Sequence, residues 1–300
     1  MDPSSEEISA TLAHYDLGDL VSEHKGHQGF ANLNLRIETT RGCFLYRVNL
    51  QQCQESMEYE HQLLHYLDEQ EIPVALPLPR TDGVKITPSP SGPVVIYSFI
   101  EGHMPDINET TVREIARVAA RMNTLPVPDH LHRDNPLTFA ATEEIVRVSP
   151  IDDALRKRVQ QELNRLRDPL SIPLPDGIVH GDLFHDNTLY RGNQLAAVID
   201  FEDASTEHRM VEIGVTINGF CAPENILEPD LVNAFLESYE SIAPLNEEEQ
   251  RLLPAYIHWG TLVMICWHLK DPTPHKLERV AWHFERLEQA KRLYPLTSNS

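Results

Sequence analysis

Three oxygen-bearing side chains form the part of this sequence best suited to chemistry. Asp182 and Asn187 lie five residues apart, and Asp200 follows thirteen residues after Asn187. An aspartate beside a hydroxyl can orient it or take its proton, and carboxylate and amide oxygens are ligands that Mg²⁺ prefers. Phosphoryl transfer needs both functions, because the metal bridges the phosphates of the nucleotide. The residue types and their spacing therefore indicate transfer of a phosphoryl group to a hydroxyl.

The surrounding segment carries a family resemblance. Protein kinases place an Asp and an Asn on one loop and a metal-binding Asp after a following strand, and the segment HGDLFHDNTLYRGNQLAAVIDFED, His180–Asp203, has the same order. It resembles the aminoglycoside-phosphotransferase and choline-kinase superfamily, whose members phosphorylate small alcohols. The LFHDN motif at Leu183–Asn187, with Ala243–Asn246 and the helix expected after it, is most similar to homoserine kinases of this fold.

The resemblance implies a two-lobed, protein-kinase-like α+β fold that uses ATP and Mg²⁺ as cofactors. It implies that Asp182 is the catalytic residue that positions or deprotonates the acceptor hydroxyl. Asn187 and Asp200 match the Mg²⁺ ligands, and His180 matches a residue that braces the loop.

The resemblance also implies a cation in the N-terminal lobe that contacts the α- and β-phosphates. The strand expected around Phe44–Val48 offers Arg47, which keeps the positive charge of the more usual lysine and adds a forked donor. Its expected helix partner is Glu60, with Glu58 as the alternative. Each of these charges could instead be a solvated surface group.

Two further nucleotide contacts are expected from position. Gly26 and Gly29 could form the loop that covers the phosphates, although an ordinary hairpin turn has the same glycines. The segment from Ser98 to Ile100 resembles the hinge between lobes, whose backbone would hydrogen-bond to adenine.

Two acidic positions leave the acceptor open. Glu202 and Asp203 follow the metal-binding Asp directly, where they could support the metal ligands, meet an ammonium group of the substrate, or lie solvated in a turn. This acidic pair is more typical of aminoglycoside or choline kinases. We expect Glu212 to lie at the start of the next helix, where a negative charge is favourable.

The elements that must position these residues divide the chain near Ser98–Gly102. Residues 1–100 are expected to form the strand-rich N-lobe, and residues 101–300 the helical C-lobe. In the N-lobe we expect a helix at Ile8–His14, strands at Ala31–Thr39 and Cys43–Val48 joined by a turn at Arg41-Gly42, a helix at Ser56–Gln70, a proline-rich connection and a strand after Pro93. In the C-lobe we expect helices at Glu109–Asn123, Ile151–Arg167, His208–Phe220, Pro229–Ile242, Glu247–Leu269 and Pro274–Leu293.

Composition narrows the functional classes further. The 300 residues carry a formal charge of −21, which disfavours nucleic acid as a partner because its phosphates are also negative. The acidic side chains could form an ordinary solvated surface or produce an electrostatic field that attracts cations. The four cysteines form no paired motif, which predicts a reducing compartment. The N-terminus lacks an apolar signal region, and the apolar run Tyr256–Cys266 is too short to cross a membrane. We expect a cytoplasmic protein.

The sequence therefore predicts an ATP-dependent kinase of a small alcohol or amino alcohol, with homoserine as the first candidate acceptor. Two other classes stay open at this point. His180, Asp182, His185 and Asp186 could ligate a metal in a hydrolase. The chain could also be a non-catalytic, kinase-shaped binding module, although such modules usually lack one of the three key residues that are present here.

Overall fold

The computed structural model describes residues 2–25 and 32–296, and the chain forms two compact units. The first unit consists of Met1–Gly102 and Ala196–Glu202, and the second of His103–Leu195 and Asp203–Ser300. A small antiparallel sheet belongs to the first unit, whereas the second is mostly helical. This organisation confirms the predicted α+β class.

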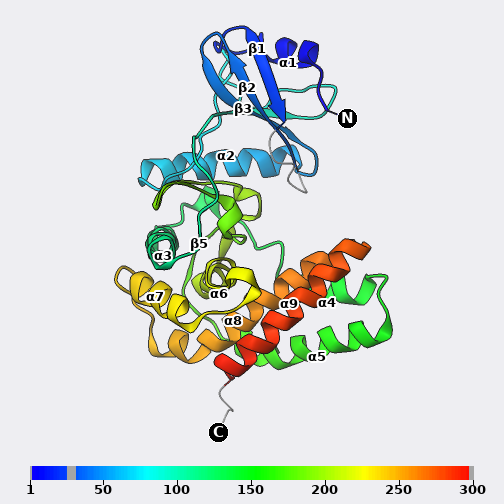
Figure 1. Ribbon diagram of the computed structural model, residues 1–300, viewed down its shortest axis with the longest axis vertical. Coiled ribbons are helices and arrows are strands. Elements are labelled where there is room, and N and C mark those ends of the chain that lie inside the picture. Colours follow the sequence, from blue (N-terminus) through cyan, green and yellow to red (C-terminus); the bar gives the residue numbers. More distant parts are fainter. Residues whose placement is uncertain (1, 26–31, 297–300) are drawn as a thin grey trace. The chain divides into compact units, whose positions relative to one another are not determined.

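The first unit is built on a four-stranded antiparallel sheet (Figure 1). Its strands lie in the order β1 (Leu20–Lys25), β2 (Asn32–Thr39), β3 (Gly42–Asn49) and β4 (Val94–Ser98). Thr39 pairs with Gly42 at the tight connection between β2 and β3. Gly42 has a φ of 148°, a conformation that favours glycine, so the predicted turn at Arg41-Gly42 is confirmed.

Helix α1 (Ser5–Leu12) covers one face of this sheet. It contributes Ile8 and Leu12 to a buried apolar cluster whose strand members are Leu35, Ile37, Tyr46, Val48, Val94 and Ile96. The helix begins before the predicted Ile8, because the Ser4 hydroxyl accepts the Glu7 N–H at 3.2 Å and caps its N-terminus. Since neighbouring strand residues point to opposite faces, the burial of Tyr46 and Val48 in this core directs Arg47 to the other face.

Helix α2 (Gln54–Glu69) is the amphipathic helix predicted for Ser56–Gln70. Its buried positions are Met57, Glu60, His61, Leu63, Leu64 and Leu67. The proline-rich connection between α2 and β4 contains isolated β-bridges, such as Pro77 to Tyr97 and Thr87 to Val94, but no continuous strand. Prolines remove the backbone donors that a longer ladder would need.

Seven α-helices in the described part of the chain build the second unit (Figure 1). They are α3 (Glu109–Thr124), α4 (Phe139–Val148), α5 (Asp153–Leu170), α6 (Arg209–Phe220), α7 (Pro229–Glu240), α8 (Glu247–His268) and α9 (Pro274–Leu293). Asn108 and Asn246 close capping boxes at the N-termini of α3 and α8. Strand β5 (Asp176–Val179) pairs antiparallel with β8 (Ser205–His208), and β6 (Thr188–Arg191) forms a two-stranded sheet with β7 (Gln194–Val198).

Helix α6 lies at the centre of the second unit, and all 12 of its residues are buried. It packs closely on α8, where Gly214 of one helix faces Gly260 of the other. A Cβ on Gly214 would overlap the carbonyl oxygen of Tyr256, and one on Gly260 would overlap the carbonyl oxygen of Gly214. The two backbones can therefore approach this closely only because both positions are glycine.

The sequence missed four helices and strands, α4, β1, β6 and β8, and misplaced several ends. All six predicted C-terminal helices are present. The four residues of β8, STEH, carry no apolar signal. Because His208 ends β8, helix α6 begins at Arg209, one residue later than predicted.

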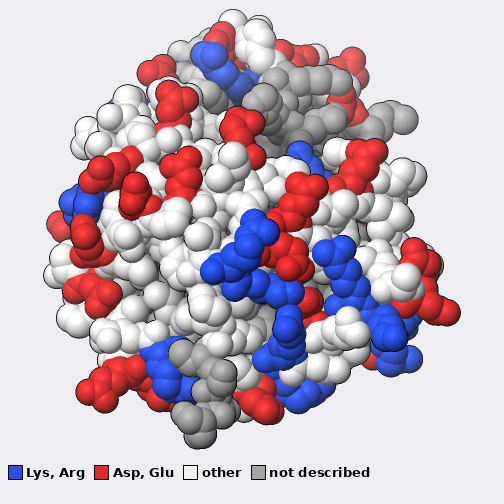
Figure 2. Space-filling view, turned by 60° about the horizontal axis from the view of Figure 1, so that its bottom comes forward, with Lys and Arg blue, Asp and Glu red and all other residues white. Residues whose placement is uncertain are grey.

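Acidic side chains are spread over the face seen in Figure 2, whereas lysine and arginine gather in a narrower region of it. Several ion pairs are exposed and close in sequence, such as Arg147 with Glu144 and Arg251 with Glu248. Such pairs add little stability. Within residues 2–25 and 32–296, no helix combines the length and the apolar character needed to cross a membrane.

The Gly214–Gly260 contact generates a stability prediction. Gly214→Ala forces a Cβ into the backbone of α8, so we expect a loss of about 3 kcal/mol or more in the free energy of unfolding, measured by urea titration. The matched control is Gly83→Ala, where a Cβ meets nothing within 4 Å and the cost is the strain of a φ of 87°, about 1 kcal/mol. Equal losses in the two variants would contradict the close-packing explanation.

Candidate active site

The segment His180–Asn187, called the Asp182 loop below, connects β5 to β6 in the second unit. Asn187 donates two hydrogen bonds from its Nδ2 atom, one to the main-chain oxygen of Asp182 and one to its Oδ2, each at 2.8 Å. The amide thus fixes both the backbone and the carboxylate of Asp182. The structure brings these two predicted site residues into direct contact.

The start of the loop is held by a buried carboxylate from α6. Glu212 is fully buried, and its two oxygens accept the backbone N–H groups of His180 and Gly181, each at 3.1 Å. Sequence reasoning placed Glu212 at the start of its helix, and the structure corrects this role, because the side chain serves the Asp182 loop instead of its own helix terminus. Burial raises the pKa of Glu212 to about 7, and the two backbone hydrogen bonds only partly oppose this shift.

Two more contacts brace the loop. His180 is completely buried, and its Nδ1 accepts the N–H of Asp182 at 3.3 Å. Farther along, His185 Nδ1 lies 3.0 Å from the carbonyl oxygen of Gly219 near the end of α6. A Cβ on Gly219 would lie 2.8 Å from the Cα of Phe184, so glycine is required for the loop to lie this close to the helix.

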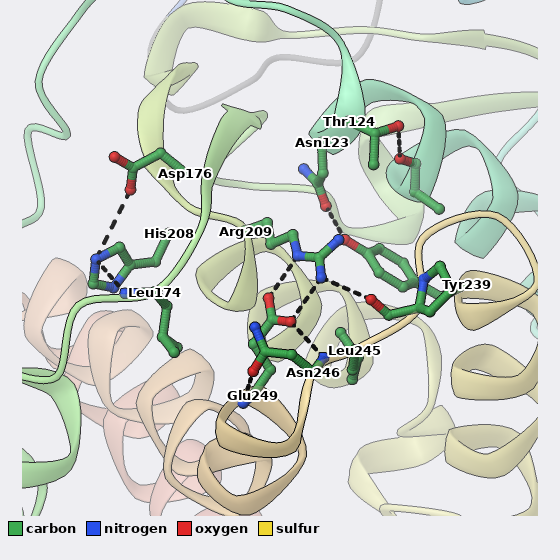
Figure 3. A network of polar contacts seen from close by, with 12 residues as sticks. Asn123, Thr124, Leu174, Asp176, His208, Arg209, Tyr239, Leu245, Asn246 and Glu249 are labelled. Atoms are coloured by element: carbon green, nitrogen blue, oxygen red, sulfur yellow. Dashed lines mark hydrogen bonds and ion pairs between the residues drawn. The ribbon is translucent and has the colours of Figure 1, made fainter.

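A polar network supports β5, the strand that leads into the loop (Figure 3). Asn123 of α3 donates to the carbonyl oxygen of Ile178 in β5 and accepts the hydroxyl of Tyr239 of α7, both at 2.8 Å. Tyr239 also hydrogen-bonds to Arg209 of α6. Arg209 in turn donates two hydrogen bonds to the carboxylate of Glu249, from Nε at 2.6 Å and from Nη2 at 2.7 Å.

The Arg209–Glu249 pair ties α6 to the N-terminus of α8. Glu249 is fully buried and also accepts the N–H of Asn246, so it completes the capping box of α8. Arg209 donates further to the carbonyl oxygen of Pro244 at 2.9 Å. The hydrogen bonds that Arg209 donates to Glu249 raise the pKa of Arg209 against the effect of burial. The polar atoms of both side chains are thus satisfied by charge-assisted hydrogen bonds inside the unit.

In the first unit, Arg47 and Asp200 form an ion pair. Arg47 Nη1 lies 3.4 Å from Asp200 Oδ1, and Arg47 Nε donates to Asn34 Oδ1 at 3.0 Å. Burial alone would lower the pKa of Arg47, but the negative charges of Asp200 and Glu60 outweigh it and the pKa is raised. Arg47 is thus a buried, permanently charged donor.

Asp200 itself has a φ of 69°, which is left-handed and costs a non-glycine residue about 1–2 kcal/mol. Such strain persists where the surrounding structure enforces it and is often found at functional sites.

The structure distinguishes between the two candidate helix acids. Glu60 is buried, receives a hydrogen bond from Gln52 at 2.9 Å and contributes to the electrostatic environment of Arg47. Glu58 is exposed and bonds to Gln54 within its own helix. The helical phase of α2 thus directs Glu60 inward and Glu58 to solvent.

The remaining predicted positions lie as follows. Gly26 and Gly29 fall outside the described residues. Ser98 ends β4 opposite Phe44, and Ile100 follows the strand two residues later. Glu202 accepts a hydrogen bond from Asn32 Nδ2 at 3.2 Å within the first unit.

The four residues considered as metal ligands of a hydrolase, His180, Asp182, His185 and Asp186, do not form a metal-binding group in the described part of the chain. In the described residues, the group of three or more side chains close enough to share a metal ion consists of Asp176, Glu207 and His208. It contains none of the four residues of that alternative. His208 is moreover engaged through Nδ1 with the hydroxyl of Tyr256 at 2.9 Å.

Comparison with known proteins decides the family. The family model described as the phosphotransferase enzyme family matches residues 25–250. The chain belongs to this phosphotransferase family.

The kinase is also similar to homoserine kinases over most of its length. It is 30% identical to the homoserine kinase of Sinorhizobium fredii, with 90% of this chain and 85% of that protein covered. It is 30% identical to the homoserine kinase of Neisseria meningitidis serogroup B, with 84% of each chain covered.

Solved structures share the fold of the kinase. A microcompartment-associated aminopropanol kinase superposes with a TM-score of 0.78 at 17% identity, covering 98% of this chain and 100% of the other. A choline kinase from Cryptosporidium parvum superposes with a TM-score of 0.74 at 13% identity, covering 97% and 96% of the two chains. Family, relatives and fold confirm the predicted reaction class: the protein is an ATP-dependent phosphotransferase that acts on a small molecule.

The raised pKa of Glu212 predicts a pH dependence of stability. The folded kinase holds the Glu212 proton more tightly than the unfolded chain, so this group's contribution to the free energy of unfolding falls as pH rises from about 4.5 to about 7. At about 1.4 kcal/mol for each unit of pKa change, we expect a decline on the order of 2–3 kcal/mol that Glu212→Gln lacks.

Urea unfolding of both proteins between pH 4.5 and 8 measures this difference. Glu285→Gln, which alters an exposed acid, is the control and should keep the wild-type profile. Parallel profiles for the wild type and Glu212→Gln would contradict the prediction.

Proposed function

We propose that this protein transfers the γ-phosphoryl group of ATP to the side-chain hydroxyl of homoserine. The observation that carries the proposal is the similarity to homoserine kinases, which extends over 90% of the chain. The Asp182 loop supports it, because a carboxylate fixed by Asn187 suits a residue that must orient a small hydroxyl.

In this proposal Asp182 is the catalytic residue. Its carboxylate accepts a hydrogen bond from the acceptor hydroxyl and orients the oxygen toward the γ-phosphorus. It takes the proton as the new oxygen–phosphorus bond forms, while the bond from the γ-phosphorus to the bridging oxygen breaks and ADP leaves. Asn187, Glu212 and His180 keep the carboxylate in place, since each fixes a different atom of the loop. A general base of this kind typically contributes about 10²–10⁴-fold to the rate.

The first unit supplies the proposed nucleotide contacts. Arg47 would bind the α- and β-phosphates, and Glu60 would help to hold its guanidinium. Gly26 and Gly29 would cover the phosphates, and the backbone from Ser98 to Ile100 would meet the adenine edge.

Magnesium is the proposed metal, with Asn187 and Asp200 as its ligands. Both offer oxygen atoms, the type of ligand that Mg²⁺ prefers over nitrogen or sulfur. Asn187 uses its Nδ2 for Asp182, which leaves the amide oxygen to face a cation. The metal would neutralise charge on the nucleotide phosphates.

We also propose that the protein acts in the cytoplasm. Its four cysteines, Cys43, Cys53, Cys221 and Cys266, are all free thiols. Free thiols fit a reducing compartment.

An acceptor screen tests the function. Purified protein is incubated with ATP and Mg²⁺ and with L-homoserine, L-serine, choline, 3-amino-1-propanol or kanamycin, and ADP release is followed. We expect the highest kcat/KM with L-homoserine. A preference for choline or kanamycin would contradict the proposed acceptor.

Substitution of Asp182 tests the catalytic assignment. Asp182→Asn keeps the shape but removes the base, so we expect kcat to fall by about 10³-fold, with little change in ATP binding measured by calorimetry. The control is Asp186→Asn, the same change at an exposed position in the same loop, for which we expect less than about a threefold effect. A comparable loss in both variants would argue against a specific role for Asp182.

A further inference from the structure

Arg47, the proposed phosphate-binding cation, is held by three different kinds of contact within the first unit. Its Nε donates to Asn34 Oδ1 at 3.0 Å, and its Nη1 lies 3.4 Å from Asp200 Oδ1. The central carbon of its guanidinium lies over the ring of Tyr97, 5.5 Å from the centroid. One edge, one end and one face of the guanidinium are thus in contact with the protein.

The contact with Asn34 follows from the register of the sheet. Asn34 of β2 pairs directly with Arg47 of the neighbouring strand β3, and Leu35 pairs with Tyr46 beside them (Figure 1). Residues that face each other in paired strands project to the same side of a sheet, and their neighbours project to the other. Because Leu35 and Tyr46 lie in the core under α1, Asn34 and Arg47 share the opposite side.

Asn34 orients Arg47 without neutralising it. The carboxylate of Asp200 is an acceptor that also offsets positive charge, whereas the amide oxygen of Asn34 carries no net charge. A guanidinium has donors on more than one edge, so a neutral acceptor at Nε can fix its plane. Arg47 therefore gains a defined direction from Asn34 and keeps its charge for a ligand.

The guanidinium is accessible at the end that lies away from Asn34. The side chain of Arg47 is 7% exposed as a whole, but that of Asp200, which lies at Nη1, is 32% exposed. Solvent therefore reaches the ion pair from the Asp200 side. An anionic group that approaches from this side meets the terminal nitrogens of Arg47 and not Nε, which is occupied by Asn34.

The bond to Nε also gives a physical reason for arginine at this position. A lysine has a single donor group at its tip, so a protein oxygen that holds the tip competes with a phosphate for it. An arginine separates the two tasks, because the protein can fix Nε while the two Nη groups bind the ligand. Asn34 and Arg47 thus form a matched pair across β2 and β3.

We propose that Asn34 is a positioning residue for nucleotide binding, which holds Nε of Arg47 so that the Nη groups face the α- and β-phosphates of ATP. The inference rests on the proposed function and deepens it, because it names the residue that aims the proposed phosphate-binding cation. A donor that is fixed before the ligand arrives loses less entropy on binding. The contribution of Asn34 therefore appears as affinity for phosphates.

Calorimetry with ATP and with adenosine tests this role on the full-length protein. Asn34→Leu keeps the approximate size of the side chain and removes the oxygen that accepts Nε. We expect ATP to bind about 10-fold more weakly to this variant, while the affinity for adenosine, which has no phosphates, changes by less than about twofold. An equal loss for both compounds would overturn the inference, because Asn34 would then shape the nucleotide site as a whole.

The matched control is Glu38→Leu, a similar replacement on the same side of β2. Glu38 accepts hydrogen bonds from Ser22 and Arg36 and none of its printed bonds involves Arg47. We expect this variant to bind ATP and adenosine within about twofold of the wild type. A loss of ATP affinity as large as that of Asn34→Leu would contradict a specific role for Asn34.

A double-substitution cycle separates positioning from a general structural effect. Arg47→Met removes every donor of the cation and keeps an apolar stem, so we expect ATP to bind about 100-fold more weakly. In the Arg47→Met protein, the further change Asn34→Leu should have less than about a twofold effect, because Asn34 then has no cation to hold. An additional loss of about 10-fold would overturn the inference, since a structural role of Asn34 would persist without Arg47.

Steady-state kinetics provides a second readout. Asn34→Leu should raise the KM for ATP by about 10-fold and leave the KM for the acceptor within about twofold. If this variant does not fold, as judged by thermal unfolding, Asn34→Val removes the same oxygen with a side chain that strands favour. An unchanged affinity of Asn34→Val for ATP would overturn the inference as well.

The results are distinguishable from a failure of the proposed function, because the calorimetry needs no acceptor. If L-homoserine is not phosphorylated but ATP binding depends on Asn34 only when Arg47 is present, the inference stands and the homoserine assignment falls. If ATP binding depends on Arg47 but not on Asn34, the inference is overturned, while Arg47 keeps its proposed role.

Discussion

The complete burial of α6 is the constraint on which the second unit depends. A helix whose residues are all buried must satisfy its polar groups mainly from its own neighbours, because water has little access to them. Asn218 illustrates the solution, since its amide donates to the carbonyl oxygens of Gly214 and Ile257 and accepts the hydroxyl of Thr261. The same rule makes α6 the scaffold of the Asp182 loop: the loop amides that need an acceptor find it in Glu212.

Charged side chains on and around α6 are accommodated in three different ways. Arg209 meets a carboxylate and donates two hydrogen bonds to Glu249. Glu212 meets backbone amides, and burial raises its pKa because the partial charges of these amides oppose that effect only in part. Arg286 meets a helix carbonyl and a side-chain amide, which supply only partial negative charge. The amount of opposite charge that surrounds each of these side chains therefore decreases from Arg209 through Glu212 to Arg286.

Most of the helices could be placed from the sequence alone, and candidate site residues could be chosen where their chemistry depends on local spacing. Asp182 and Asn187 could be recognised because one loop holds both, and the strong apolar periodicity of the six C-terminal helices was readable. The sequence favoured Glu60 but left Glu58 open, and the helical phase of α2 in the structure buries Glu60. Whether each of these residues has its predicted role is a matter for the proposed experiments.

Other features depend on contacts that no local pattern encodes. Glu212 reaches His180 across 32 positions in the sequence, and Arg286 reaches Asn218 across 68. An acidic residue in the first turn of a helix is ordinary, as is an arginine in a long helix, so neither signals its partner. Strand β8 was missed for a related reason, because its polar residues form a strand through pairing with β5 and not through their own preference.

The first unit is discontinuous in the sequence, and this has a consequence for synthesis on the ribosome. Its final segment, Ala196–Glu202, emerges only after the whole of His103–Leu195 has been translated. At about 5–20 residues per second, that delay is on the order of 5–20 s. During this interval Arg47 lacks Asp200, and Val74 lacks the bridge to Val198. The nascent N-terminal region therefore cannot complete its fold in the order of translation, and its maturation must wait for the middle of the chain.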